Sequence, residues 1–344
     1  MLSLSGLNIT EVASLSIIQS TLYSNESQQL HERWSDKKNS NMRLAEVYDK
    51  FDRKKAERLR SCARMLVFGR TERGLALVNG NFCRVGLCPM CQWRRARKLQ
   101  GQMARILHHL EPRGYKYIFV TLTVRNCGAA ELSGTLDKLA EGWRRLSQYK
   151  AVKSIAMGAY RGLEITHDCS EIITPEMYAA RRLYYIGQGL HVGDLNPNYN
   201  TYHPHYHCLI AVKPSYFTGR LYLSQEKWRE LWRRALGVDY LPSVNVRRVK
   251  GRGMEGVIEA CKYTVKESDF LTDDIQFDTQ TVRALDAALH KRRLSGLSGD
   301  FRDAHKMLNL SDTDDPAPDT DDSMACERVS FVWVTGVRAY RAVK

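Results

Sequence analysis

The stretch that decides the fold runs from Thr201 to Val212 and reads TYHPHYHCLIAV. In an extended chain alternate residues share a face, so His203, His205 and His207 point the same way. Two imidazoles at i and i+2 on one strand can chelate a divalent ion if a neighbouring strand supplies a third ligand. Pro204 has no N–H for the ladder and suits the start of a strand. We therefore predict His205 and His207 as ligands and keep His203 as an alternative.

The best third ligand in the sequence is Glu164, which lies in the strand-like run RGLEIT. Leu163 and Ile165 enclose it, and an acid between two apolar strand residues is costly to bury unless it is paired or binds metal. His167 and Asp168 follow closely and remain alternatives. The sequence thus predicts a divalent metal site of two imidazoles and one carboxylate.

The surrounding pattern predicts an α+β fold. Two amphipathic helices have apolar faces over residues 132–146 and 228–235, and the second begins after Ser224 as N-cap and ends at Gly237. Strands that alternate with helices in this way indicate a sheet covered by helices on one face. The further β-rich runs lie at residues 115–124, 158–166 and 244–249.

A second chemical signal lies in residues 255–268, EGVIEACKYTVKES, which we predict as one helix. On that helix Glu259, Tyr263 and Lys266 fall at i, i+4 and i+7 and share a stripe. The phenol is a candidate nucleophile toward a phosphodiester, the ammonium would offset developing negative charge, and the carboxylate would activate water. A cation that polarises a phosphate and a tyrosine that attacks it are complementary halves of one reaction.

Four of the nine cysteines form a second candidate metal site with soft ligands. Cys83, Cys88 and Cys91 cluster before a basic helix, and Cys62 lies across a predicted hairpin at residues 65–82. Four thiolates suffice for a closed tetrahedral Zn²⁺ site, whereas imidazole and carboxylate ligands suit a different ion. The zinc would fix the hairpin against the helix and present the basic start of that helix to DNA phosphates, namely Arg94, Arg95, Arg97 and Lys98.

Composition and charge favour a nucleic-acid partner. The 344 residues carry 52 Lys and Arg against 38 Asp and Glu, a net charge of +14, although residues 311–322 hold six Asp and no base. Nine cysteines are too few for a disulfide scaffold in a chain of this length, and the odd number argues against full pairing. No run approaches the roughly 20 apolar residues of a membrane helix, and the first residues lack the basic start of a secretory signal. We therefore expect a cytoplasmic protein without a membrane partner.

Together these residues resemble a known family. HPHYHCLIAV resembles the His-hydrophobic-His motif of the HUH endonucleases, and EACKYTVKESDF resembles the tyrosine motif of the replication initiators of small rolling-circle plasmids. FVTLTV and CRVGLCPMCQWRRARK are also similar to that plasmid family, and the similarity runs from about Met42 to near the C-terminus. A histidine strand before a single tyrosine is the order of replication initiators, whereas conjugative relaxases generally place the tyrosine first.

The resemblance implies site-specific nicking of one DNA strand at the plasmid double-strand origin. Tyr263 would attack the scissile phosphate, leaving a 5′-phosphotyrosyl link and a free 3′-OH. The histidine pair with Glu164 would hold Mn²⁺ or Mg²⁺, Glu259 would drive hydrolysis at termination, and Lys266 matches the family's Tyr-x-x-Lys spacing. Because the chain has no P-loop motif, a host helicase is the expected partner.

The resemblance also implies an HUH-type antiparallel sheet covered by helices and preceded by a small zinc-ribbon-like module. We predict a weakly ordered extension at 1–41, a zinc-ribbon-like DNA-binding module with its basic helix at 42–113, and the endonuclease domain at 114–310. An acidic linker at 311–328 and a C-terminal strand at 329–344 complete the chain.

Two other classes remain open at this point. A noncatalytic zinc-ribbon DNA-binding regulator explains the charge and the cysteines but leaves Tyr263 and Glu259 without a role. An HUH transposase or relaxase shares the chemistry and differs in biology.

Overall fold

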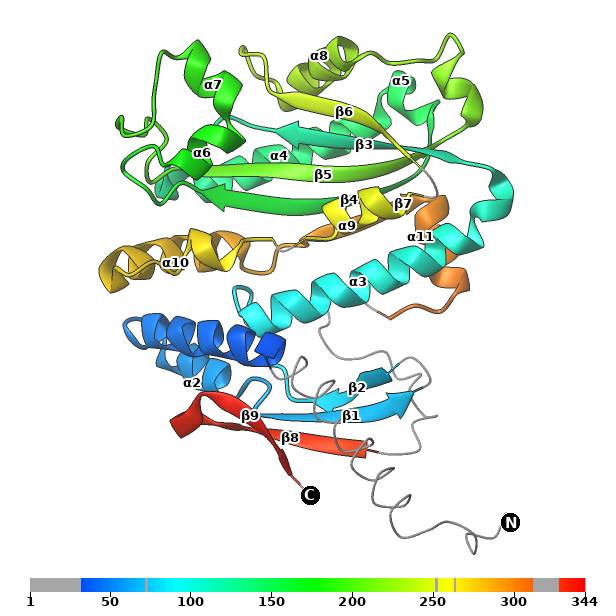
Figure 1. Cartoon of the computed structure of the whole chain (residues 1–344). Coiled ribbons are helices and arrows are strands. Elements are labelled where there is room, and N and C mark those ends of the chain that lie inside the picture. Colours follow the sequence, from blue (N-terminus) through cyan, green and yellow to red (C-terminus); the bar gives the residue numbers. More distant parts are fainter. Residues whose placement is uncertain (1–31, 72–73, 251–252, 263, 312–327, 344) are drawn as a thin grey trace, which may run out of the picture.

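The computed structural model describes residues 32–71, 74–250, 253–262, 264–311 and 328–343, and Figure 1 shows its two sheets. In this part of the chain the larger sheet has five antiparallel strands in the order β6-β3-β5-β4-β7. The predicted strands are confirmed, and β7 is an additional edge strand that the pattern hides because its sequence, SGLSG, lacks β-branched residues. The strands are β3 (Lys116–Thr123), β4 (Ala156–His167), β5 (Tyr202–Val212), β6 (Val244–Val249) and β7 (Ser295–Gly299).

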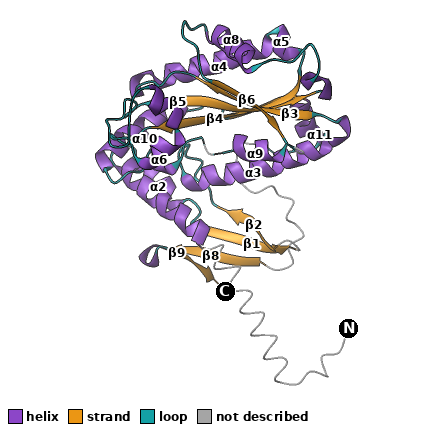
Figure 2. Cartoon of the chain, turned by 45° about the horizontal axis from the view of Figure 1, so that its top comes forward, coloured by secondary structure: helices purple, strands orange, loops and turns teal. Residues whose placement is uncertain are grey.

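Helices pack on both faces of this sheet, as Figure 2 shows, so the prediction of helices on one face is wrong. The reason lies in β5, where the run CLIAV is apolar at every position and serves two cores. Cys208 and Ile210 face one core, while Leu209 and Ala211 face the other. The first core contains α4 (Leu132–Gln148) and α8 (Gln225–Leu236), and the second contains α3 (Pro89–His109), α9 (Met254–Ala260) and α11 (Asp300–Met307).

The predicted ends of α8 are confirmed. Ser224 Oγ accepts a hydrogen bond from the Lys227 N–H at 3.2 Å, and Gly237 takes the left-handed backbone conformation with φ of 69°. The other helices are α2 (Arg53–Ser61), α5 (Lys150–Lys153), α6 (Pro175–Ala180), α7 (Arg182–Gly187) and α10 (Ile275–Leu289), which packs against α4. Short 3₁₀ helices occupy Glu111–Arg113, Ala129–Glu131, Pro214–Phe217, Glu267–Asp269 and Thr335–Val337.

A smaller sheet of strand order β2-β1-β8-β9 lies at the other end of the molecule (Figure 1). The predicted hairpin is confirmed as β1 (Met65–Thr71) and β2 (Gly74–Gly80). The prediction of a single strand at 329–344 is wrong, because the 3₁₀ turn after β8 (Arg328–Val334) reverses the chain into β9 (Ala339–Val343). Since β8 pairs with β1, residues near both ends of the chain build one sheet.

A helix at residues 32–49 precedes α2, so the predicted weakly ordered extension over 1–41 is wrong for residues 32–41. Trp34 packs edge-on against Phe68 and Trp93, with ring centroids 5.7 and 4.6 Å apart. The polar composition hides this helix because its buried side also carries Lys38 and Asn41. Residues 1–31 lie outside the described part of the chain.

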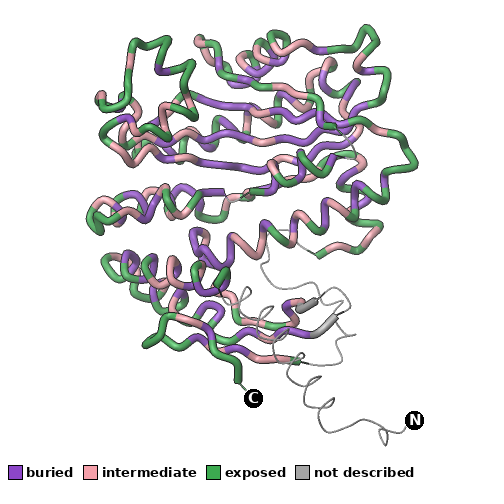
Figure 3. Tube along the Cα trace, in the orientation of Figure 1, coloured by how far each residue is buried: buried purple, intermediate pink, exposed green. Residues whose placement is uncertain are grey.

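Helix α3 connects the two parts of the molecule. Its first turn carries Cys91, and its later turns bury Met103 and Ile106 against the larger sheet. The predicted boundary near residue 113 therefore does not separate two independent cores, and Figure 3 shows burial along α3 as well as along the central strands. The acidic stretch at 312–327 lies outside the described residues. Within the described chain, no helix combines the length and apolar character needed to cross a membrane.

Candidate active site and cysteine cluster

Glu164, His205 and His207 converge on one face of the five-stranded sheet. The register of the central strand β5 places His205 opposite Glu164 of β4 and His207 opposite Thr121 of β3. The Nε2 atoms of the two histidines lie 3.2 Å apart. Glu164 Oε2 lies 2.9 Å from His207 Nε2 and 3.7 Å from His205 Nε2. Three potential ligand atoms thus surround one point.

The spacing of these atoms fits a hard divalent cation. Metal–ligand bonds of about 2.1 Å place adjacent ligands of an octahedral ion about 3 Å apart, close to the observed 3.2 and 2.9 Å. The side chains of Glu164, His205 and His207 are only 8, 10 and 11% exposed, so little water would compete for these three positions. Two imidazoles and one carboxylate form a mixed nitrogen and oxygen donor set that a divalent ion can use.

The second nitrogen of each imidazole orients its ring. His205 Nδ1 lies 3.1 Å from the carbonyl oxygen of His203, and His207 Nδ1 lies 3.3 Å from Thr121 Oγ1. When an ion occupies the site, an Nδ1 that donates its proton leaves Nε2 unprotonated, which is the state a metal ion requires. Without an ion, Nε2 can instead donate to Glu164. Thr121 is therefore a positioning residue that sequence reasoning missed, although it lies within the FVTLTV run.

Glu164 is held in its charged form. Burial disfavours the carboxylate, but the hydrogen bonds and charges of His205 and His207 outweigh that cost and hold the pKa of Glu164 well below its usual value. Lys266 adds a positive charge, with its Nζ 3.9 Å from Glu164 Oε1. The site therefore presents an ionised carboxylate at neutral pH, the form that binds a cation.

The alternative ligands His167 and Asp168 do not belong to this group. The two ring nitrogens of His167 lie 3.0 Å from the carbonyl oxygen of Asp269 and 3.1 Å from Asn200 Oδ1. Asp168 forms an ion pair with Arg181 at 2.8 Å. Both residues are therefore engaged in contacts that hold the end of β4.

His203 also stays outside the group. It lies within β5, which starts at Tyr202, so the expectation that the strand starts at Pro204 is wrong. Pro204 has no N–H to donate to a neighbouring strand. The strand accommodates it because the pairing with β3 stops at His205, so Pro204 is paired on one side only, with β4. Burial lowers the pKa of His203 to about 4. Its neutral side chain lines a neighbouring cavity of about 560 Å³, together with Tyr184 and Tyr240.

Helix α9 is shorter than the sequence pattern predicts, and the expectation of one helix over 255–268 is wrong. The helix ends at Ala260, and the chain then runs beside β4, where the Ile165 N–H donates to the carbonyl oxygen of Thr264 at 2.7 Å. The Val265 N–H donates to Gln92 Oε1 of α3 at 3.3 Å. These tertiary hydrogen bonds, and the burial of two β-branched residues, outweigh the local preference for a helix.

The predicted stripe of three catalytic residues therefore does not lie on one helix. Glu259 lies in α9, where its Oε1 accepts a hydrogen bond from Lys262 Nζ at 2.7 Å. Lys266 lies in the extended segment, where it reaches Glu164. Tyr263 lies outside the described residues. The roles of these three residues stay predictions.

Gly162 allows the end of α9 to approach the sheet. A Cβ at Gly162 would lie 2.5 Å from the carbonyl oxygen of Ala260, closer than any side chain permits. Gly162 is two residues from Glu164 on the same face of β4. The chain that follows α9 therefore passes close to the carboxylate of the candidate metal site.

The four predicted cysteines form a compact cluster. Cys62 Sγ lies 3.6 Å from Cys88 Sγ and 3.7 Å from Cys91 Sγ, and the Sγ atoms of Cys83 and Cys91 lie 3.7 Å apart. A disulfide requires about 2 Å between its sulfur atoms. Four thiolates around a tetrahedral ion with Zn–S bonds of about 2.3 Å lie about 3.8 Å apart. The cluster thus has the spacing of a closed four-thiolate metal site, and the identity of its ion stays a prediction.

Two residues of the helix at 32–49 complete this cluster, and sequence reasoning missed both. Lys38 is 0% exposed, and its Nζ donates to the carbonyl oxygens of Arg60 and Cys62 at 2.8 and 2.6 Å. Cys88 Sγ donates to Asn41 Oδ1 at 3.0 Å. The pKa of Lys38 is lowered from its usual value, because the effect of burial exceeds the opposite effect of the nearby cysteines. A buried ammonium here would offset the net negative charge of a metal ion with four thiolates.

Cys88→Ser is expected to release the metal ion and to destabilise the protein by about 3 kcal/mol, because an incomplete ligand set loses much of the folding energy that a structural ion supplies. For a protein of 344 residues the midpoint of thermal unfolding should fall by roughly 4 °C. Zinc would be quantified by mass spectrometry of the purified protein. Cys169→Ser is the control, since Cys169 lies outside the cluster and should keep the metal. Equal zinc content in both variants would contradict the proposed site.

The basic start of α3 is less exposed than predicted. Arg97 is exposed, whereas Arg94, Arg95 and Lys98 are half-buried. Arg95 lines a cavity between α3, α2 and the segment after α10. Contact of these four residues with DNA stays a prediction.

Comparison with known proteins identifies the family. A family model described as "Replication protein" matches residues 74–340. The chain is 36% identical to a "Protein rep" of Bacillus amyloliquefaciens, covering 89% of this chain and 93% of that protein. It is 32% identical to a "Protein rep" of Streptococcus pneumoniae, covering 87% and 88% of the two chains. No solved structure matches the chain. The chain therefore belongs to this replication protein family, as its resemblance to replication initiators predicts.

Proposed function

We propose that this protein initiates rolling-circle plasmid replication by a metal-dependent nick in one strand of the double-strand origin. The observation that carries the proposal is the convergence of Glu164, His205 and His207, whose ligand atoms lie within 4.8 Å of one another. In a protein that only bound DNA, this group would be structural, and Tyr263 and Glu259 would have no role. Because the chain has no P-loop, we assign strand separation to a host helicase.

In this proposal the two histidines and Glu164 hold Mn²⁺ or Mg²⁺. When bound, the cation would polarise the scissile phosphate and offset the charge on its oxygens. Lys266 brings a second positive charge to the same place, since its Nζ lies 3.9 Å from Glu164 Oε1. The Nδ1 contacts of His205 and His207 would keep the two rings aimed at the cation.

Tyr263 is the proposed nucleophile. Its neighbour Thr264 accepts a hydrogen bond from Ile165, the residue after Glu164, and this contact supports a nucleophile beside the cation. The phenol oxygen would form a bond to phosphorus, and the P–O bond to the 3′ oxygen would break, leaving a 5′-phosphotyrosyl link and a 3′-OH. One phosphodiester replaces another, so the strand can later be rejoined without ATP.

Glu259→Gln is expected to nick at close to the wild-type rate but to release the covalently bound DNA at least about tenfold more slowly, because water activation would lose its general base. Covalent protein–DNA product would be followed with time on denaturing gels. Glu255→Gln is the matched control, since Glu255 lies on the same helix and pairs with Arg247. Unimpaired release by the Glu259 variant would argue against a role for this carboxylate.

The proposal is tested directly with supercoiled plasmid that carries the cognate origin. Protein and Mn²⁺ should convert it to open circles, and EDTA or an origin-free plasmid should prevent the conversion. Origin binding without nicking under any divalent ion would reject the enzyme and support the noncatalytic regulator.

A further inference from the structure

A basic cleft lies between α2, the start of α3 and the segment that follows α10, and the proposed chemistry does not use it. The cleft encloses about 290 Å³. Its lining contains one acidic residue, Asp286, and six residues with permanent positive charge: Lys55, Arg58, Arg84, Arg95, Lys291 and Arg292. We call these six residues the cleft cations.

The cleft cations come from both parts of the molecule. Lys55 and Arg58 lie on α2, Arg84 precedes Cys88, and Arg95 lies on α3. The remaining two follow α10, so they belong to the part of the chain that carries the metal-binding face. Six positive charges that converge from elements distant in sequence indicate a polyanionic ligand.

Two of the cleft cations have an unusual backbone. Arg84 and Lys291 both have φ of 56°, in the left-handed region that residues with a side chain rarely adopt. Each is exposed and lines the cleft. Strained conformations of this kind cluster at ligand-binding sites, where the surrounding structure maintains them.

Two of the cleft cations form ion pairs with carboxylates. Lys55 Nζ lies 2.6 Å from Asp286 Oδ2, and Arg292 Nη1 lies 2.6 Å from Asp137 Oδ1. Arg58 donates to the neutral carbonyl oxygen of Cys83. Among the described residues, no hydrogen bond or ion pair engages the ammonium group of Lys291. The lining thus holds one carboxylate against six cations, and the ammonium group of Lys291 is available to a ligand.

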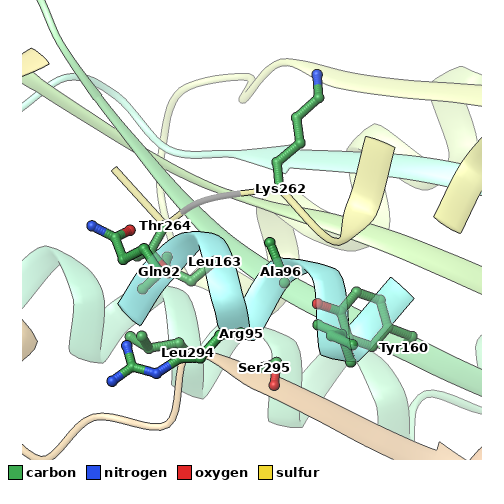
Figure 4. A pocket seen from close by; sticks show the side chains of 11 residues that line it. Gln92, Arg95, Ala96, Tyr160, Leu163, Lys262, Thr264, Leu294 and Ser295 are labelled. Carbon is green, nitrogen blue, oxygen red and sulfur yellow. The ribbon is translucent and has the colours of Figure 1, made fainter. Parts of the chain in front are cut away.

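The cleft adjoins the segment that contains the proposed nucleophile. Arg95 and Leu294 line both the cleft and a smaller cavity of about 40 Å³ beneath α3. Lys262 and Thr264, the residues before and after position 263 in the sequence, line that smaller cavity. Figure 4 shows Thr264 beside Gln92 of α3, while the Lys262 side chain extends away from that helix. A polyanionic ligand held in the cleft would therefore lie close to the proposed nicking site.

We propose that the cleft binds backbone phosphates of single-stranded DNA next to the nicked position, an inference that rests on the proposed function. A cleft of about 290 Å³ can hold part of a single strand but cannot enclose a duplex. Its lining contains no Phe, Tyr or Trp, so bases have no stacking platform there, and the contact is with phosphate and independent of sequence.

The test measures binding of a fluorescent single-stranded 20-mer in EDTA, without cleavage. Arg84→Glu/Lys291→Glu should weaken binding about tenfold or more at 0.1 M salt. Arg84→Ala/Lys291→Ala should reduce the slope of log affinity against log salt by about 1.4, since each phosphate contact contributes about 0.7. The slope reports ion release, which a purely structural role of these residues would not change. Unchanged affinity and slope in both variants would overturn the proposal.

A matched control carries the same charge change elsewhere. Arg302→Glu/Lys306→Glu alters two exposed cations of α11 that do not line the cleft, and it should bind the 20-mer like the wild type. An equal loss of affinity in this control would show that the effect comes from the overall charge of the protein, and it would overturn the proposal that DNA binds in the cleft. The plasmid nicking assay is scored separately. If the cleft variants lose binding and the wild type does not nick the plasmid, the proposed function is rejected, whereas the proposal that DNA binds in the cleft is supported.

Discussion

Tyr263→Phe is expected to abolish both nicking and the covalent protein–DNA product, a loss of at least about 10³-fold. The substitution removes one oxygen atom, which is the atom that would attack phosphorus, and leaves the metal ligands and Lys266 in place. No other group in the proposed mechanism can form the phosphotyrosyl link. The measurement is the conversion of supercoiled origin plasmid to open circles in Mn²⁺, with the covalent product detected on a denaturing gel.

Tyr222→Phe is the matched control for this experiment. Tyr222 is 55% exposed on a segment before α8, away from the metal-binding face, and its substitution should leave both products unchanged. Both variants should bind the origin like the wild type, because the phenol oxygen of Tyr263 has no proposed part in docking. Nicking by Tyr263→Phe at the rate of the control would remove this residue from the mechanism.

His205→Ala/His207→Ala is expected to reduce nicking by at least about 100-fold and to weaken Mn²⁺ binding strongly. The two Nε2 atoms lie 3.2 Å apart and constitute two of the three candidate ligands. Without them Glu164 alone would hold the cation, and a single carboxylate binds a divalent ion weakly in water. Mn²⁺ affinity would be measured by calorimetry, and nicking by the plasmid assay, on the same protein preparations.

His109→Ala is the control for the histidine experiment, since His109 is exposed at the end of α3. Both proteins would be treated with EDTA and then supplied with Mn²⁺. The control should regain full activity, whereas the double variant should not. Full recovery by the double variant would exclude the histidine pair as the ligands of an essential ion. Zinc content should stay equal in both, because the cysteine cluster is separate.

The parts of the site that follow from short-range geometry could be predicted from the sequence. The histidines share a face because a strand repeats every two residues, and the register of β5 preserves that face. The cysteines at 83, 88 and 91 lie within nine residues, so a tight turn suffices to bring their sulfur atoms together. Ser224 and Gly237 mark the ends of α8 through local capping.

The errors arose where distant contacts overrule local preference. The helix predicted over 255–268 ends at Ala260 because Ile165 and Gln92 offer hydrogen bonds to the residues that follow. The helix at 32–49 went unrecognised because Lys38 interrupts its apolar side. Burial of Lys38 requires hydrogen-bond acceptors, and carbonyl oxygens at the end of α2 provide them.

The sequence by itself determined the family, the α+β class, the candidate imidazole pair and the cysteine set, because each depends on residue type and on spacing along a few turns or one strand. Only the tertiary structure decided that Glu164 and not His167 or Asp168 joins the histidines, and that Lys266 reaches the same carboxylate. It also decided that the cleft cations, which come from elements far apart in the sequence, line one cleft. The physical reason is strand order and register: residues 43 positions apart in the chain, such as Glu164 and His207, meet only because β4 and β5 pair with one alignment.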